Sequence, residues 1–253
     1  MRIDINCDMG ESFGAYRIGE DEAIIPFITS ANIACGWHGG DPMVMAATVR
    51  LAKEHSVAIG SHPGYPDLLG YGRRNMETFP GEIKNYVLYQ IGALSGFARD
   101  SRMKLQHVKP HGALYNLAAG DERAANEVIS AIKAFDPELI LVAPAGSLCA
   151  EMAASASLRV VKEAFADRAY LRNGQLAPRH LQGAVIKDSD VVRQRVLTLV
   201  TSGRMICTDG SQITLEAETI CIHGDTPNAW KLAGAIRETL EGAGVSILPM
   251  GRE

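Results

Sequence analysis

Apolar and polar positions along the chain follow two periods that alternate from end to end. Short apolar runs typical of buried strands are separated by longer segments whose apolar residues recur every three or four positions, as on one face of a helix. Strands are predicted near residues 2–7, 31–36, 57–62, 106–111, 138–144, 159–165 and 219–223, with a last short run at 246–250. This regular alternation predicts an α/β fold with a parallel sheet. Because no linker, low-complexity stretch or fixed-period repeat interrupts it, we predict one domain over residues 1–253.

The helical segments carry recognisable start signals. Those with the clearest periodicity are predicted at residues 42–55, 81–98, 122–132 and 227–242. Asp41 and Asp121 stand at the N-cap positions of the first and third of these helices, and Thr226 with Pro227 starts the last. The glycine-rich turn at residues 36–40 would let the backbone approach a ligand closely, and the helix start after it offers N–H groups suited to an anion.

The strand ends decide between an open sheet and a closed barrel. Nearly every predicted strand is followed by polar residues: Asp8 and Glu11, His38, His62, Lys109 and His111, Glu163, and His223 with Asp225. An open sheet usually concentrates its site at one switch point, whereas a barrel brings the carboxyl ends of all strands to one mouth. We therefore predict a distorted (β/α) barrel of seven or eight strands. The long connections 63–79 and 166–187 are predicted to cover its mouth.

The first strand has an unusual polar face. Side chains alternate along a strand, so Asp4, Asn6 and Asp8 share one face and the apolar residues between them share the other. A strand inside an α/β protein is covered on both sides, where carboxylates need partners or a catalytic task. Glu11 adds another acid just past the strand. The alternative interpretation is a structural hydrogen-bond network.

Lysine and arginine residues are predicted to face these acids. In the run from His107 to His111 the odd-numbered residues share one face, which would bring Lys109 into the mouth beside the acids of the first strand. A lysine there would neutralise a carboxylate, bind an anionic substrate or act as a base, and the alternative is a structural Lys–Asp pair. Arg168 and Arg179 carry forks suited to a carboxylate or a phosphate.

The same residue types allow a metal site. Asp8, His38 and His62 would make an Asp-His-His set with open positions for water and substrate. The chain contains no GxxxxGK[ST] or HExxH motif, and no GxGxxG follows the first strand. The acids and histidines therefore point to acid–base or metal-assisted attack on a carbonyl or phosphoryl centre.

Composition narrows the class of protein. The chain has 253 residues, of which 47% are hydrophobic, and a formal net charge of -4 with scattered Lys and Arg, so no nucleic-acid or anionic-membrane partner is indicated. The apolar runs are far shorter than the ~20 residues of a membrane span, and the first residues lack a signal-peptide pattern. Five cysteines without CxxC spacing fit reduced thiols in a cytoplasmic protein.

Long blocks of the sequence resemble the LamB/YcsF family, whose members form the A subunit of the bacterial ATP-dependent 5-oxoprolinase. These blocks are residues 4–11, 32–42, 62–67, 72–74, 108–116, 163–168, 178–179 and 222–227. The resemblance implies a barrel of the glycoside hydrolase/deacetylase type and two partner subunits, B and C. It also implies hydrolysis of the lactam 5-oxo-L-proline to L-glutamate, with ATP, used with Mg, converted to ADP and phosphate.

The resemblance and the residue chemistry together give one set of predicted roles. The predicted catalytic residues are Asp8, Glu11, Lys109 and His111, the predicted substrate-binding residues are Asn6, His38, Arg168, Arg179, His223 and Asp225, and the predicted metal ligands are Asp8, His38 and His62. In this interpretation Asp8 is the general base or a metal ligand, Lys109 stabilises developing negative charge, and Arg168 or Arg179 holds the substrate carboxylate. Because no nucleotide motif is visible, part of the phosphorylating site is assigned to the partner subunits.

Two other functions remain open at this point. A metal-dependent carbohydrate deacetylase would use the Asp-His-His set and would release acetate without ATP. A non-catalytic subunit would bind 5-oxoproline and present it to its partners, but this explains poorly why so many titratable groups converge.

Overall fold

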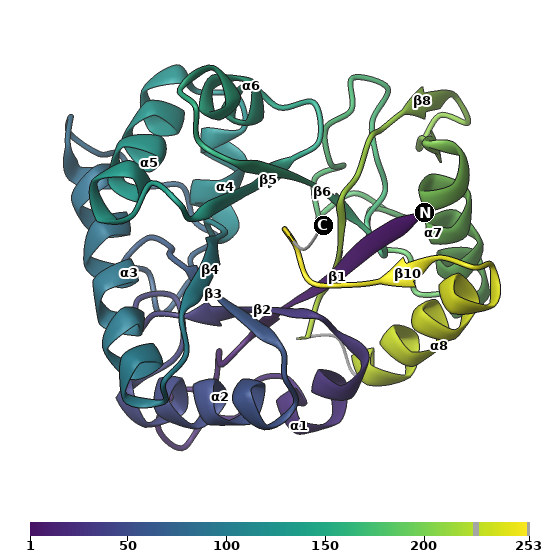
Figure 1. The fold of residues 1–253 in the computed structure, drawn as a ribbon. Helices are drawn as coiled ribbons and strands as arrows, with labels where there is room; N and C mark the ends of the chain where they lie inside the picture. Colours follow the sequence, from purple (N-terminus) through teal and green to yellow (C-terminus); the bar gives the residue numbers. More distant parts are fainter. Residues whose placement is uncertain (225–227, 252–253) are drawn as a thin grey trace.

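Seven parallel strands form a closed barrel in the computed structural model, which describes residues 1–224 and 228–251 (Figure 1). In order around the barrel these are β1 (Arg2–Met9), β2 (Ser30–Ala34), β3 (Ala58–His62), β4 (Leu105–Val108), β5 (Ile140–Pro144), β6 (Val160–Phe165) and β9 (Thr219–Ile222). The barrel closes because β1 pairs with β2 on one side and with β9 on the other. The last strand, β10 (Ser246–Ile247), pairs only with the start of β1. The predicted barrel is confirmed.

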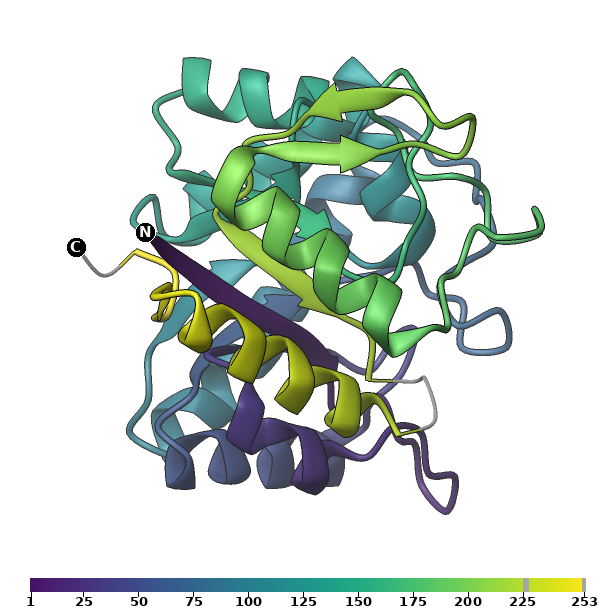
Figure 2. The same cartoon turned by 90° about the vertical axis from the view of Figure 1, so that its right-hand side faces the viewer.

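Helices surround the barrel, and five of the helical elements in the described residues were not predicted individually. The helical elements are α1 (Asp21–Ile24), η1 (Ile25–Phe27), α2 (Pro42–Glu54), α3 (Glu82–Asp100), α4 (Gly112–Ala118), α5 (Glu122–Phe135), α6 (Leu148–Ser155), α7 (Ser189–Ser202) and α8 (Ala229–Gly242). A hairpin of β7 (Arg204–Ile206) and β8 (Gln212–Thr214) follows α7. In Figure 2, α7 and α8 lie side by side along one flank of the barrel.

The predicted helix starts can be compared with the caps. Asp41 accepts hydrogen bonds from the N–H groups of Met43 and Val44, and Asp121 accepts one from Ala124, so both predicted N-caps are confirmed. The Asp41 side chain thereby takes up two of the N–H groups that the sequence offered to an anionic ligand. The predicted start of the last helix at residues 226–227 lies outside the described residues.

The apolar core lies between the strands and the helices. Ile5, Ile33 and Ile59 are fully buried members of the main core cluster, on the outer faces of β1, β2 and β3. Among the described residues no helix is both long and apolar enough to span a membrane. All five cysteines are buried and free.

The barrel interior is polar where β1 lines it. The carboxylate of Asp4 accepts hydrogen bonds from the hydroxyl groups of Thr29, Ser30 and Thr219, and its side chain is buried. One step further along β1, Asn6 donates to Thr219 at 2.7 Å. The predicted polar face of the first strand is therefore confirmed, and its polar groups all have partners.

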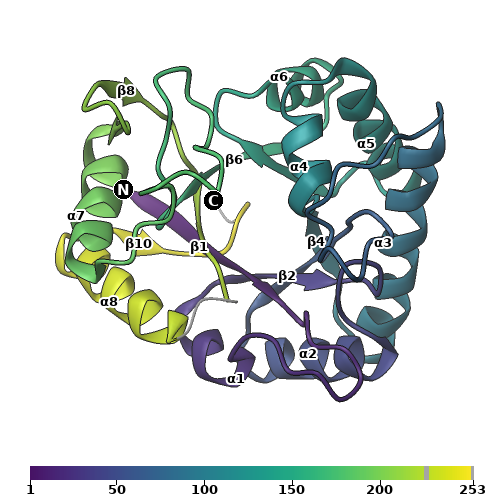
Figure 3. The ribbon, with the colours of Figure 1, turned by 180° about the vertical axis from the view of Figure 1, so that it is seen from behind.

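The long connections extend from one end of the barrel. In Figure 2 the N-terminus of β1 lies on the left, and the loops that follow β1, β3 and β6 project on the right, at the carboxyl ends of the strands. Seen from behind, the same loops lie across the strand ends (Figure 3). The connections 63–79 and 166–187 contain no regular helix or strand, as predicted. The predicted site residues that line the cavity, among them Asp8, His62 and Lys109, lie at this end of the barrel.

Candidate functional site

Lys109 is the central cation of the site. It follows β4 and its side chain is only 2% exposed. Its Nζ lies 2.8 Å from Oε1 of Glu163 and 3.0 Å from Oδ1 of Asp8, and it donates to Oδ1 of Asn6 at 3.2 Å. The predicted meeting of this lysine with the acids of the first strand is confirmed. A buried ammonium with two carboxylate partners is held in one position.

A layer of amides and one imidazole supports this ion-pair network. Asn32 on β2 donates to Oδ1 of Asn6 at 2.7 Å and to Oδ1 of Asp8 at 2.8 Å. The Oδ1 of Asn32 in turn lies 2.7 Å from Nε2 of His107, so the imidazole donates this bond. Asn6 also donates to Glu163 at 2.9 Å. Because every bond joins different strands, the network fixes the Asp8 carboxylate relative to the whole barrel.

Burial and neighbouring charges set the ionisation of Asp8 and Lys109. Burial opposes ionisation of Asp8, but His62 and Lys109 outweigh it and hold the pKa of Asp8 well below its ordinary value. Burial also opposes the ammonium form of Lys109, yet the carboxylates of Asp8 and Glu163 hold the pKa of Lys109 well above its ordinary value. Both groups therefore remain charged near neutral pH.

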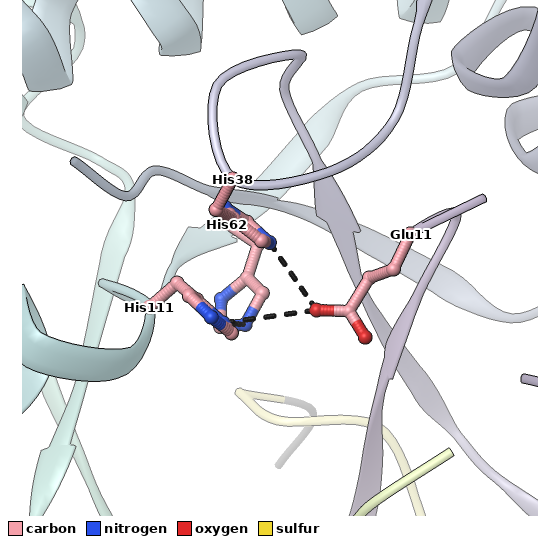
Figure 4. Close-up of side chains that lie close together, drawn as sticks. All are labelled: Glu11, His38, His62 and His111. Atoms are coloured by element: carbon pink, nitrogen blue, oxygen red, sulfur yellow. Dashed lines mark hydrogen bonds and ion pairs between the residues drawn. The ribbon is translucent and has the colours of Figure 1, made fainter. Parts of the chain in front are cut away.

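Figure 4 shows a cluster of three histidines and one glutamate. We call Glu11, His38, His62 and His111 the His/Glu cluster; one ligand atom from each lies within 4.8 Å of those of the others, and all four residues are buried. Oε1 of Glu11 lies 3.2 Å from Nε2 of His38 and 3.7 Å from Nδ1 of His111. Nε2 of His62 lies 3.4 Å from Oδ1 of Asp8. The cluster and the ion-pair network thus meet at Asp8, and four such ligands could hold a metal ion.

Glycines allow the loops to bring the cluster together. A Cβ on Gly39 would stand 2.9 Å from the carbonyl oxygen of Glu11, so only glycine lets the turn that carries His38 pack on the backbone after β1. At Gly72, whose φ is +63°, a Cβ would lie 2.7 Å from Cβ of His38 and 2.8 Å from Cδ2 of His111. Gly39 and Gly72 therefore allow the loops that carry the cluster to pack closely against one another.

Burial keeps His38 and His111 of this cluster neutral. Burial and the nearby His62 lower the pKa of His38 well below its ordinary value. Burial and the stacked His38 ring, whose centroid lies 3.7 Å away, do the same to the pKa of His111. Burial raises the pKa of Glu11 above its ordinary value, although His111 acts in the opposite direction. A pair of carboxylates whose pKa values are shifted apart, as in Asp8 and Glu11, is typical of acid–base sites.

A second set of polar side chains is linked by hydrogen bonds: Arg179, His223 and Asp167. Nη2 of Arg179 donates to Nε2 of His223 at 2.9 Å, so Nδ1 of His223 carries the proton and donates to Asp167 at 3.0 Å. Arg179 is exposed. Arg168 is buried instead, and its guanidinium donates to the carbonyl oxygen of Ala177 at 2.6 Å.

Most of these groups face one cavity of about 1120 Å³. Of the predicted site residues, the cavity is lined by Asp8, His62, Lys109, His111, Arg168, Arg179 and His223. Asn6, Glu11 and His38 lie behind this lining, in contact with it through the hydrogen bonds, ion pairs and ring stacking given above. Asp225 lies outside the described residues. The volume exceeds what a small lactam needs, and ligand pockets commonly measure about 300–1000 Å³.

Six residues that take part in the site were not predicted as members: Asn32, His107, Asp167, Glu163, Tyr115 and Tyr71. Glu163 was noted only as nearby charge, Tyr115 donates its hydroxyl proton to that glutamate, and Tyr71 donates its hydroxyl proton to Oε2 of Glu11. Tyr115 could have been found, because it lies four residues after His111, one turn into α4. No periodic signal indicates Tyr71, which lies in an irregular connection.

The sequence is similar to one protein family over nearly its whole length. Residues 3–253 match the LamB/YcsF family. The chain is 66% identical over 253 residues to the 5-oxoprolinase A subunit of Syntrophobacter fumaroxidans, covering 100% of both chains. It is 52% identical over 251 residues to the protein of the same name from Pyrococcus furiosus, covering 99% of this chain and 98% of the other.

Solved structures agree with the fold. The crystal structure of the lactam utilization protein from Thermus thermophilus superposes with a TM-score of 0.94 at 50% identity, covering 99% of this chain and 100% of the other. A putative cellobiose-phosphate cleavage protein from Enterococcus faecalis shares the fold at 13% identity, with a TM-score of 0.56 over 98% and 97% of the two chains. The match to the family over residues 3–253 and the identities to these relatives show that the chain belongs to the LamB/YcsF family.

Proposed function

We propose that this chain is the A subunit of an ATP-dependent 5-oxoprolinase, which opens the lactam ring of 5-oxo-L-proline to give L-glutamate. The observation that carries the proposal is the convergence of a charged Asp8–Lys109 pair and an exposed arginine, Arg179, on one cavity. A lactam carboxylate presents one anionic group and one amide to such a wall. The names of the relatives described above support the same reaction.

ATP is needed because the amide is a poor electrophile. Phosphorylation of the amide oxygen would create a leaving group and an activated carbon for attack by water, with ADP and phosphate as co-products. We assign this phosphoryl transfer, with Mg, to a site shared with subunits B and C, because the sequence carries no P-loop motif.

Within the cavity Asp8 is assigned as the group that accepts a proton from the attacking water. It lines the cavity and stays ionised, and Lys109 and Asn32 hold its carboxylate in place. Lys109 is assigned to stabilise the negative charge that develops on the reacting oxygen, because it is a buried cation held in one position at the cavity wall. Glu11 and His111 lie beside Asp8 and complete the reacting centre.

The substrate carboxylate is assigned to Arg179. Its guanidinium is exposed and is oriented by His223, which Asp167 holds in one tautomer. Arg168 has a different task, because its donors bind backbone carbonyl oxygens within the 166–187 connection. We therefore propose that Arg168 shapes the wall that carries Arg179.

Glutamate release in the assembled system tests the proposal. The chain is mixed with candidate B and C subunits and 5-oxoproline, with and without ATP, and glutamate and ADP are measured. Activity is expected only in the complete mixture with ATP. Asp8→Asn should lower kcat by at least about 100-fold, the usual contribution of a general base. Asp100→Asn is the matched control, because Asp100 is exposed at the end of α3.

Each failure has a separate meaning. If the assembled wild-type complex releases no glutamate, the assigned reaction is wrong. If the wild type is active and folded Asp8→Asn retains full activity, the reaction stands and the role of Asp8 is wrong.

A second candidate function is a metal-dependent carbohydrate deacetylase. The His/Glu cluster is the observation that favours it, since three imidazoles and a carboxylate are suited to a catalytic metal. It predicts release of acetate from acetylated sugars by the chain alone, without ATP. Absence of acetate release from the metal-loaded chain would remove this candidate.

A further inference from the structure

The hydrogen bonds around His62 and His111 fix both tautomers. Nδ1 of His62 lies 2.6 Å from the carbonyl oxygen of Lys109, and Nε2 of His111 lies 2.8 Å from the carbonyl oxygen of Tyr71. A carbonyl oxygen only accepts, so each of these nitrogens carries a proton and donates it. In the neutral ring the other nitrogen, Nε2 of His62 and Nδ1 of His111, then carries a lone pair.

These two lone pairs face each other. Nε2 of His62 and Nδ1 of His111 are 3.0 Å apart, and when both rings are neutral with their outer nitrogens protonated, neither of these atoms has a proton to donate to the other. Oε1 of Glu11 lies 3.7 Å from the same Nδ1 and 3.2 Å from Nε2 of His38. Four groups that can accept a hydrogen bond, on Glu11, His38, His62 and His111, therefore surround one point. A single proton at that point could bridge only two of them.

His62, His111 and Glu11 are each oriented by a further hydrogen bond on the side away from the cluster. The backbone carbonyls of Lys109 and Tyr71 orient the two imidazoles, and the Tyr71 hydroxyl donates to Oε2 of Glu11, leaving Oε1 toward the histidines. Histidine ligands of metals almost always donate their second N–H to a carbonyl or carboxylate in this way. Tyr71 supports two of the groups at once and has a φ of +55°, a left-handed conformation that is strained for a tyrosine.

We infer that Glu11, His62 and His111, with His38 as a fourth donor, bind a divalent transition-metal ion such as Zn²⁺. The ligand set shares His38 and His62 with the set predicted from the sequence, but contains Glu11 and His111 in place of Asp8. Ligands about 2.0–2.1 Å from a tetrahedral ion lie roughly 3.4 Å apart, and the contacts of 3.0, 3.2 and 3.7 Å lie close to this spacing.

The imidazole rings differ in how well they are oriented to bind the metal ion. The His38 and His111 rings are stacked with an angle of 4° between their planes, so their in-plane lone pairs run parallel and His38 must tilt to reach the ion. The buried Nδ1 of His38 has no hydrogen-bond partner among the described residues, so its ring is not fixed at that atom. The other three ligands are in place.

Donor type decides which metal is expected. Imidazole nitrogen suits Zn²⁺ and similar transition ions, whereas Mg²⁺ and Ca²⁺ prefer sites made of oxygen. His62 and His111 line the cavity, so an ion between them would supply a Lewis acid to a carbonyl bound there. This inference goes beyond the proposed reaction, since none of the steps assigned above requires this ion.

Calorimetric titration with Zn²⁺ tests the site directly. The chain is stripped with a chelator, dialysed and titrated, and one equivalent of Zn²⁺ is expected to bind, with Mg²⁺ binding at least about 100-fold more weakly. His62→Ala and His111→Ala should lower the Zn²⁺ affinity by at least about 100-fold, more than loss of a supporting partner costs. His38→Ala should lower it less. His55→Ala is the matched control, because His55 is exposed at the end of α2.

A variant that spares the ligands guards against misfolding. Tyr71→Phe retains the carbonyl that orients His111 and removes only the hydroxyl on Glu11, so the Zn²⁺ affinity should fall about 10–100-fold. Circular dichroism checks the fold of each variant. Replacement of Zn²⁺ by Co²⁺ adds a visible spectrum that reports nitrogen and oxygen ligation.

Two results would overturn the inference. The first is a stripped, folded wild-type chain that binds Zn²⁺ no more tightly than about 1 mM, in which case a shared proton joins the two imidazoles. The second is Zn²⁺ binding that Tyr71→Phe and the folded histidine variants leave unchanged, because the ion then lies elsewhere.

Discussion

Removal of the Lys109 ammonium should destabilise the barrel more than any exposed ion-pair change. The perturbation is Lys109→Met, which keeps an unbranched side chain of similar length but removes the charge. Nζ lies 2.8 Å from Glu163 and 3.0 Å from Asp8, and the side chain is 2% exposed. Both carboxylates would remain buried without their common partner.

The magnitude follows from that burial. Breaking a buried pair by removing one partner costs about 3–5 kcal/mol of the free energy of unfolding, because an uncompensated charge stays in the interior. For a chain of this size about 1 kcal/mol shifts the melting temperature by roughly 2–4 °C, so a loss of about 6–20 °C is expected. Thermal and urea unfolding followed by circular dichroism measure it.

Lys162→Met provides the control. Lys162 pairs with Glu216 at 2.9 Å, but the two side chains are 42% and 79% exposed. Such surface pairs contribute at most about 1 kcal/mol. The two lysine variants therefore remove similar contacts in different surroundings.

A double-mutant cycle tests the coupling. Combining Lys109→Met with Glu163→Gln removes both charges of the shorter contact, so the double variant should be more stable than the sum of the single losses predicts, by about 1–3 kcal/mol. A loss below about 1 kcal/mol for Lys109→Met, or strictly additive losses, would refute the reasoning.

Three further predictions concern the interior and one loop. The pKa of Asp4 is raised from 3.8 to about 6 by burial, so Asp4 should contribute about 3 kcal/mol of stability that is lost as pH rises from about 4 to about 6, and Asp4→Asn should remove this contribution in urea unfolding. Gly60→Ala places a Cβ 2.2 Å from Cδ2 of His107 and should cost about 1–3 kcal/mol in the same assay. Arg168→Leu removes donors to two carbonyl oxygens of the 166–187 connection and should speed its proteolysis at least about tenfold.

Folded Asp4 holds its proton to higher pH than the unfolded chain, so its contribution is complete below about 4 and lost above about 6; a wild-type slope that persists in Asp4→Asn contradicts the assignment. Gly96→Ala is the control for Gly60→Ala, because a Cβ there meets no atom within 4 Å; equal effects would disprove the clash. Proteolysis of Arg168→Leu at wild-type rates would show that Arg168 does not hold the loop.

Local patterns were enough to predict the barrel and part of the site. The period of two in β1 places Asp4, Asn6 and Asp8 inside, and the same period carries Lys109 to them, because alternation along a strand does not depend on distant contacts. The helical elements α1, η1, α4, α6 and α7 were not predicted individually. All but α7 are short, and short helices owe their stability to packing that a periodic pattern does not show.

The His/Glu cluster depends on loop paths that a sequence pattern does not describe. His38 follows β2 in a turn whose Gly39 packs on the backbone of Glu11, a contact between two separate loops. Tyr71 reaches the cluster from an irregular connection. For the same reason the sequence could not separate the exposed Arg179 from Arg168, whose donors bind backbone within the connection.

The position of β1 between β2 and β9 has a consequence for synthesis of the chain. One edge of β1 finds its partner within the first 34 residues, whereas the other waits for Thr219–Ile222, near the end of the polypeptide. Until those residues leave the ribosome, β1 exposes an unpaired edge, and Asp4 and Asn6 lack the hydroxyl of Thr219. Barrel closure is therefore a late, long-range event, and nascent or truncated chains that end before β9 should depend on chaperones to avoid aggregation.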